Sequence, residues 1–152
     1  LRDVYKRQFL ATPDADYIRD LFAARAAIEP AAVRWGAFAD APSLVTLTSS
    51  AFDYAARGEH QEVSAINQRF HRTLVAALGS PTLNEQMENL LARMRLTFLL
   101  AIPRYPQLHA DHIQGNITLA TLIADGKRLE AATLSHDSLM NTCEKILAVL
   151  DD

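Results

Sequence analysis

The chain has 152 residues, 49% of them apolar, and a formal net charge of −3, so it fits one domain with a sizeable core. Its single cysteine, Cys143, excludes an internal disulfide. No apolar run is long enough to span a bilayer, and no segment resembles a secretory signal. We therefore expect a soluble, cytoplasmic protein with no membrane partner.

The first eight residues, "LRDVYKRQ", look foreign to the rest of the chain. Residues 3–8 read as one translated frame of a transposase-adapter end that is used in DNA library preparation, so we set 1–8 aside as a fusion scar. Without their three basic and one acidic residues, the net charge changes from −3 to −5. Such an acidic domain is a poor ligand for a phosphate backbone. The expectation is that 9–152 is the C-terminal part of a longer protein.

Six amphipathic helices are predicted in chain order, because apolar residues recur at helical spacing throughout. Pro30 should kink the first of them, and Ser80 followed by Pro81 marks the start of the fourth. No useful alternating strand pattern occurs, and the connections are short. The sequence therefore predicts an all-α antiparallel bundle. The predicted helices cover residues 16–38, 42–57, 62–78, 81–101, 107–124 and 127–150.

Several polar side chains lie next to apolar helix positions. Asn67 and His71 are four residues apart in "INQRFHRTL", and Gln114 and Thr118 repeat that spacing on the fifth helix. His136 lies among apolar neighbours on the sixth. Each has two interpretations: an inward-facing site, or the ordinary solvated face of a helix with histidines that are exposed or individually paired.

Three further charged or ionisable residues have simpler interpretations. Arg25 and Glu29 are four residues apart and most simply form a surface ion pair of small energetic value. His112, which follows the break "PRYP", is expected to be exposed.

Three segments together resemble a known family. They are "RAAIEPAAVRWGA" (25–37), "NQRFHRTLVAALGSPTL" (67–83) and "QGNITLATLIADGKRLEAATLSH" (114–136). Their order and separation resemble the FCD domain, the C-terminal effector-binding domain of the FadR subfamily of bacterial GntR transcription regulators. The resemblance covers nearly all of 14–150. It implies a helical bundle with an internal ligand pocket, no enzymatic activity, homodimerisation, and DNA binding through a winged helix-turn-helix domain that would precede residue 9.

The resemblance also implies a metal site with one Asp and three His. The matching positions here are Asn67, His71, Gln114 and His136, so two of the four have become amides. Amide oxygens are poor ligands for zinc or nickel, and we expect weak metal binding at most, more simply none. His112 cannot replace Gln114 without a register shift, because two residues turn a helix by roughly 200°.

The hypothesis that follows is direct binding of a small carboxylate effector. An arginine would take the carboxylate, with Arg25 the first candidate and Arg93 or Arg95 the next. The first shell looks polar, which favours a small hydrogen-bonding effector over a long acyl chain. The remaining candidate effector-binding residues are Asn67, His71, Gln114, Thr118 and His136.

Two other functions stay open. A metal-centred bundle enzyme would need several inward carboxylates and Glu-x-x-His pairs, which the sequence lacks. A ligand-free helical interaction module would have a dry core with His71 and His136 individually satisfied. Convergence of Asn67, His71, Gln114 and His136 around a cavity would favour the effector-binding interpretation, and scattered positions would count against it.

Overall fold

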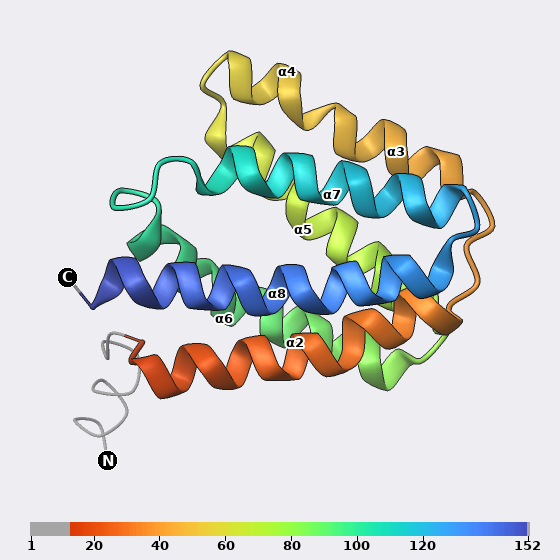
Figure 1. Cartoon of the computed structure of the whole chain (residues 1–152), viewed down its shortest axis with the longest axis horizontal. Helices are drawn as coiled ribbons and strands as arrows, with labels where there is room; N and C mark the ends of the chain where they lie inside the picture. Colours follow the sequence, from red (N-terminus) through yellow and green to blue (C-terminus); the bar gives the residue numbers. More distant parts are fainter. Residues whose placement is uncertain (1–12, 152) are drawn as a thin grey trace.

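Helices make up most of residues 13–151, the part of the chain that the computed structural model describes, and no strand occurs within it (Figure 1). The predicted all-α class is confirmed. The predicted second helix is interrupted near Ser50 and becomes α3 and α4. The suspected adapter segment and the boundary at residue 9 lie outside the described residues. The helices are α2 (Ala15–Trp35), α3 (Ala41–Ser49), α4 (Ala51–Ala56), α5 (His60–Ala76), α6 (Pro81–Ala101), α7 (Leu108–Ala124) and α8 (Arg128–Leu150).

Local sequence signals set the ends of several helices. Asp14 and Ser80 are N-caps whose side chains accept hydrogen bonds from backbone N–H groups at the starts of α2 and α6. Pro81 follows as the first residue of α6, where its missing N–H costs nothing. Gly79 and Gly126 adopt positive φ values of 68° and 75° between helices, a conformation that residues with a Cβ rarely adopt.

The first helix ends earlier than its predicted range of 16–38. It stops at Trp35, and Gly36 follows in extended conformation with its N–H bonded to the carbonyl of Ala32. A Cβ on Gly36 would lie 2.7 Å from the Cβ of Ala77 at the end of α5. The absence of a side chain at Gly36 therefore lets the connection after α2 pass directly against α5.

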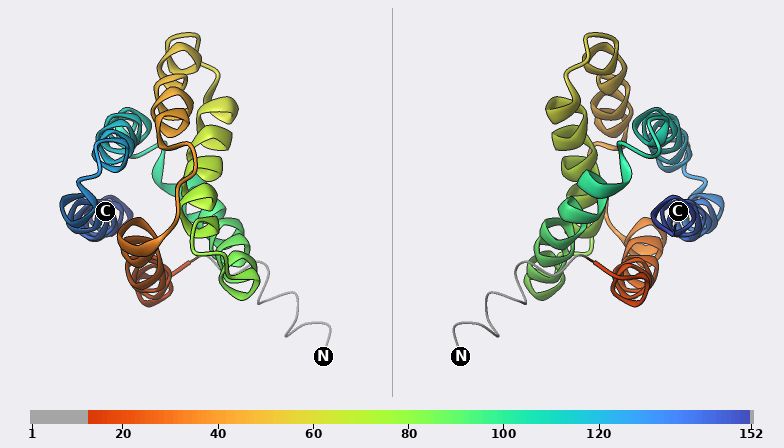
Figure 2. Two further views of the ribbon diagram at one scale, coloured as in Figure 1. Left: turned by 90° about the vertical axis from the view of Figure 1, so that its right-hand side faces the viewer. Right: turned by 90° about the vertical axis from the view of Figure 1, so that its left-hand side faces the viewer.

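The helices pack antiparallel, as predicted. α8 runs antiparallel to both α2 and α7, and α7 runs antiparallel to α3 (Figure 1). Viewed end-on, α2, α8 and α7 line one side of the bundle and α5 and α6 the other, with α3 and α4 at one edge (Figure 2). α2 continues through Pro30. Among residues 13–151, no helix combines the length and apolarity that crossing a membrane requires.

Candidate functional site

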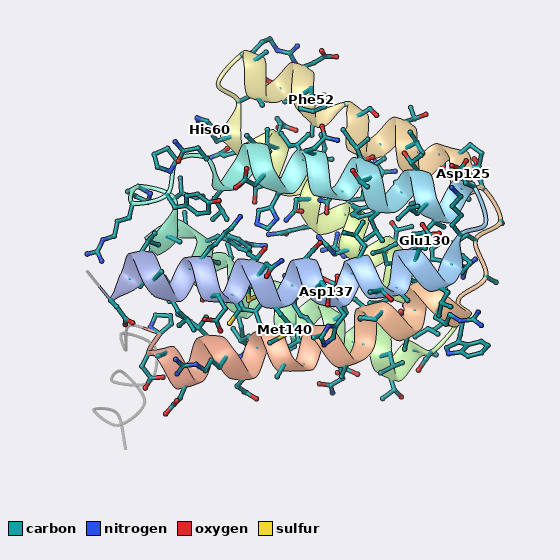
Figure 3. The ribbon with its side chains drawn as sticks, viewed as in Figure 1. Phe52, His60, Asp125, Glu130, Asp137 and Met140 are labelled. Carbon is teal, nitrogen blue, oxygen red and sulfur yellow. The ribbon has the colours of Figure 1, made fainter. Side chains whose placement is uncertain are left out.

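A cavity of about 480 Å³ opens between α5, α6 and α7, with single residues of α2, α3 and α4 completing its wall. Its volume falls within the usual range for small-molecule sites. The exposed residues His60, Gln61, Arg95 and Leu99 mark its mouth, and His60 begins α5 near the end of α4 (Figure 3). The buried part of the wall includes Arg25, Thr48, Val63, Leu91, Met94 and Ile113.

Arg25 is the charged residue in the buried part of this wall and is only 3% exposed. Its Nε and Nη2 donate to the carboxylate of Glu29 at 2.6 and 3.3 Å. His71 Nδ1 lies 2.5 Å from Glu29 Oε1, and because a carboxylate accepts, the imidazole donates from Nδ1. Arg25, Glu29 and His71, here called the buried charge cluster, thus connect the cavity wall on α2 to α5.

Electrostatics keep Glu29 ionised within the buried charge cluster. Burial raises the pKa of this carboxyl, but the charges of Arg25 and His71 and their hydrogen bonds outweigh it and lower the pKa to about 2. The ionised carboxylate fixes two of the three guanidinium nitrogens of Arg25. Among the described residues, Nη1 of Arg25 has no acceptor, so it remains for a ligand.

The expectation of a surface pair for Arg25 and Glu29 is therefore wrong. Both lie on the helix face that includes Ile18, Phe22 and Val33, and that face packs into the core. The helical spacing already contained this information, because the apolar stripe of α2 passes through both charged positions. Their burial could have been inferred from that stripe.

A second polar group on the cavity wall comes from α5 and α7. Asn116 Nδ2 donates to Asn67 Oδ1 at 2.7 Å, and both side chains line the cavity. His112 also lines it and meets the ring of Phe98 edge-on, with centroids 5.3 Å apart. The expectation that His112 is exposed is wrong, because it shares the inward face of α7 with Asn116 and the buried Ile113.

Gln114 and Thr118 face solvent instead of the cavity. Both are exposed, and Thr118 Oγ1 donates to the backbone carbonyl of Gln114 at 3.0 Å. Gln114 follows His112 by two residues, and Thr118 follows Asn116 by two. Two residues turn an α-helix by roughly 200°, so Gln114 and Thr118 point away from the side of α7 on which His112 and Asn116 lie. The polar stripe is thus the solvated face of α7, which is the simpler of the two interpretations.

His136 is also at the surface. Its side chain is 53% exposed, and Nδ1 lies 3.1 Å from the carboxylate of Asp137, which lies on the outer side of α8 (Figure 3). The expected convergence of four positions is therefore not observed. Asn67 lines the cavity and His71 belongs to the buried charge cluster, whereas Gln114 and His136 lie outside.

The two other arginine candidates occupy different surroundings. Arg95 is exposed at the cavity mouth and donates to Gln68 Oε1 at 3.4 Å. Arg93 does not line the cavity; it donates to the hydroxyl of Tyr17 at 3.1 Å and lies 3.9 Å from Asp20. Arg93 therefore joins α6 to the start of α2.

The donor set expected from the sequence does not fit a divalent metal in this arrangement. Residues 13–151 contain no group of three or more His, Cys, Asp or Glu side chains placed to hold one ion. The amide oxygen of Asn67 is bonded to Asn116, and Nδ1 of His71 is bonded to Glu29. In the buried part of the cavity wall, the positive charge comes from Arg25 of the buried charge cluster.

Comparison with known proteins gives one match. Residues 20–140, which make up most of the chain, match the model of the FCD domain family. No curated protein and no solved structure matches the sequence.

Proposed function

Because the chain belongs to the FCD domain family, the C-terminal effector domains of FadR-type GntR regulators, we propose that its cavity binds a small organic acid that modulates DNA binding by the full regulator. FCD domains are regulatory ligand-binding domains and not catalytic ones. This sets aside the metal-centred enzyme. The remaining question is how this chain recognises its effector.

The proposal rests on one observation, which is that the buried Arg25 lines a cavity of the size of a small-molecule site. Desolvation strengthens the attraction of Arg25 for an anion, and Glu29 together with His71 holds the guanidinium in place. An effector carboxylate would accept from Nη1 of Arg25. Asn67, which also lines the cavity, would offer its amide N–H groups.

The proposed recognition needs no metal. In a metal-dependent site the ion supplies the positive charge for the carboxylate, and here Arg25 would supply it. Zinc or nickel bound through Asn67, His71, Gln114 and His136 would require Gln114 and His136 to leave the solvent-exposed faces on which they lie. We therefore propose that the effector binds directly to protein groups.

The proposed output is a change in geometry of a homodimer. An effector at Arg25 contacts α2, and the buried charge cluster ties α2 to α5, so binding would stiffen this pair of helices. In a dimer with winged helix-turn-helix domains ahead of residue 9, such a change would alter the fit to a palindromic operator in the cytoplasm.

Calorimetry with a small panel of acids tests the proposal. The probes are benzoate, octanoate, lactate and gluconate, titrated into the protein and into a double variant, Arg25→Gln with Glu29→Gln. The double change removes the charges of Arg25 and Glu29 together, so neither of the two is left as an unpaired buried ion. We expect at least one acid to bind, and its affinity to fall at least tenfold in the double variant.

Arg93→Gln is the matched control, because it removes an arginine that lies outside the cavity. The control should bind the same acid with unchanged affinity. Equal binding by all three proteins, or no binding of any acid in the panel, would contradict the proposal and favour the ligand-free interaction module.

A further inference from the structure

We propose that the cavity selects an amphipathic monocarboxylate: one anionic group on a largely apolar, hydroxyl-poor body, such as a medium-chain fatty acid or an arylalkanoic acid. This inference rests on the proposed function, because it narrows the effector class of the same cavity. It replaces the expectation of a polar pocket for a small hydrogen-bonding molecule.

The wall of the cavity is largely apolar. Apart from Arg25 and Thr48, its buried residues include Val63, Leu91 and Met94. Aromatic and aliphatic side chains at its less buried part extend this surface toward the mouth, where Leu99 is 63% exposed. An apolar ligand body would cover this surface and remove it from water, which is favourable in proportion to the area covered.

Part of the polar capacity of the wall is already engaged within the protein. The hydroxyl of Thr48 donates to the backbone carbonyl of Leu44 at 2.9 Å. One amide N–H of Asn116 and the amide oxygen of Asn67 are engaged with each other.

The hydroxyl groups of a sugar acid would find few partners among the buried residues of the wall, whose polar members are Arg25 and Thr48. Each hydroxyl left unmatched on burial costs roughly tenfold or more in affinity. A polyhydroxylated acid would therefore lose more by desolvation than its carboxylate gains at Arg25.

The charges near the cavity favour one negative charge on the ligand. At the buried end, the positive charge of Arg25 is shared with Glu29, which His71 also contacts. A second carboxylate placed there would find no further charged donor, because Nε and Nη2 of Arg25 already donate to Glu29 and only Nη1 remains for the first. The other arginine, Arg95, is exposed at the mouth, where solvent screens its charge.

The test compares three probes of matched chemistry by calorimetry on the intact chain. Octanoate has a negative charge and an apolar body. Octanamide has the apolar body without the charge, and gluconate has the charge on a hydroxylated body. We expect octanoate to bind at least tenfold more tightly than either of the others.

A pair of surface variants locates the apolar contact. Leu99→Asp places a charge at the cavity mouth, and Leu129→Asp makes the same change at a residue that is 70% exposed and does not line the cavity. Because both positions are exposed, both variants should fold. Octanoate affinity should fall at least threefold in Leu99→Asp and stay unchanged in Leu129→Asp.

The outcomes separate this inference from the proposed function. Tighter binding of gluconate than of octanoate would overturn the inference while leaving an acid-binding cavity. Equal binding of octanoate and octanamide would overturn the selection of an anion. Failure of every acid to bind would overturn the proposed function itself, and with it this inference.

Discussion

The ionisation of Glu29 within the buried charge cluster contributes to the stability of the fold. Because its pKa is lowered from 4.5 to about 2 on folding, it stabilises the fold above pH 4.5, and this contribution is lost as the pH falls toward 2. The shift corresponds to roughly 3 kcal/mol. The loss should be visible as acid sensitivity that depends on this one side chain.

Glu29→Gln should therefore destabilise the protein most near neutral pH and least near pH 2. Urea unfolding between pH 7 and pH 2 measures the difference from the unchanged protein, which should shrink by roughly 3 kcal/mol over that range. Glu88→Gln is the control, because Glu88 pairs with Arg72 at the surface and is 52% exposed. A constant difference for Glu29→Gln would contradict the assigned ionisation.

Thr97 has a buried polar atom without a partner, in contrast to the paired carboxylate of Glu29. Its side chain is fully buried in α6, and its hydroxyl has no hydrogen-bond partner among the described residues. Thr97→Val keeps the shape and removes the unpaired hydroxyl, so the free energy of unfolding should rise by about 1 kcal/mol. Thr48→Val is the matched change at a buried hydroxyl that is bonded to Leu44, and it should give no gain. Chemical denaturation measures both.

At the scale of elements, helical periodicity predicted which segments are helices but not which polar stripe faces inward. On α7 the sequence offers Gln114 with Thr118 on one side and His112 with Asn116 on the other, each pair at helical spacing. The packing of α7 against α3 and α5 decides between them. The apolar stripe through Ile113 was the signal that favoured His112 and Asn116.

On α2, the N-cap and the positions of Arg25 and Glu29 on the apolar stripe follow from local sequence, whereas the helix ends three residues before its predicted end. Their shared partner His71 is 42 residues from Glu29 in the sequence, so that contact depends on how α5 docks. Local patterns contain no information on such docking, which is why the buried charge cluster could not be predicted in full.

Replacement by alanine should change the stability of the protein in opposite directions at Gly36 and at Gly115. Gly36→Ala forces a Cβ to within 2.7 Å of Ala77, and we expect destabilisation of about 1–3 kcal/mol. Gly115 lies inside α7, and no neighbouring group lies within 4 Å of the position that an alanine Cβ would take, so Gly115→Ala should stabilise by about 0.5–1 kcal/mol. Thermal unfolding of the two variants measures the contrast, and similar values for both would contradict the close approach after α2.

At the scale of the whole molecule, the antiparallel bundle followed from short connections between amphipathic helices. Helical periodicity and short connections did not predict the cavity, which only the family resemblance implied, because it arises where α5, α6 and α7 fail to fill the space between them. The residues of its wall come from six helices. Only Arg25, Asn67 and Arg95 among the predicted site residues line it.

Removal of metal ions should leave ligand binding intact. If Arg25 supplies the positive charge, octanoate should bind equally well before and after dialysis against a chelator, and added zinc or nickel should not tighten it. Calorimetry in both states measures this. A loss of binding on chelation that zinc restores would show that an ion, and not the arginine, holds the carboxylate.

Binding of an effector carboxylate at Arg25 is tested most directly by a crystal structure with 4-bromobenzoate, in which anomalous scattering from bromine locates the ligand. We expect bromine in the cavity between α5, α6 and α7 and the carboxylate within hydrogen-bond distance of Arg25. A carboxylate bound to a metal ion, or bromine sites confined to the surface, would contradict it.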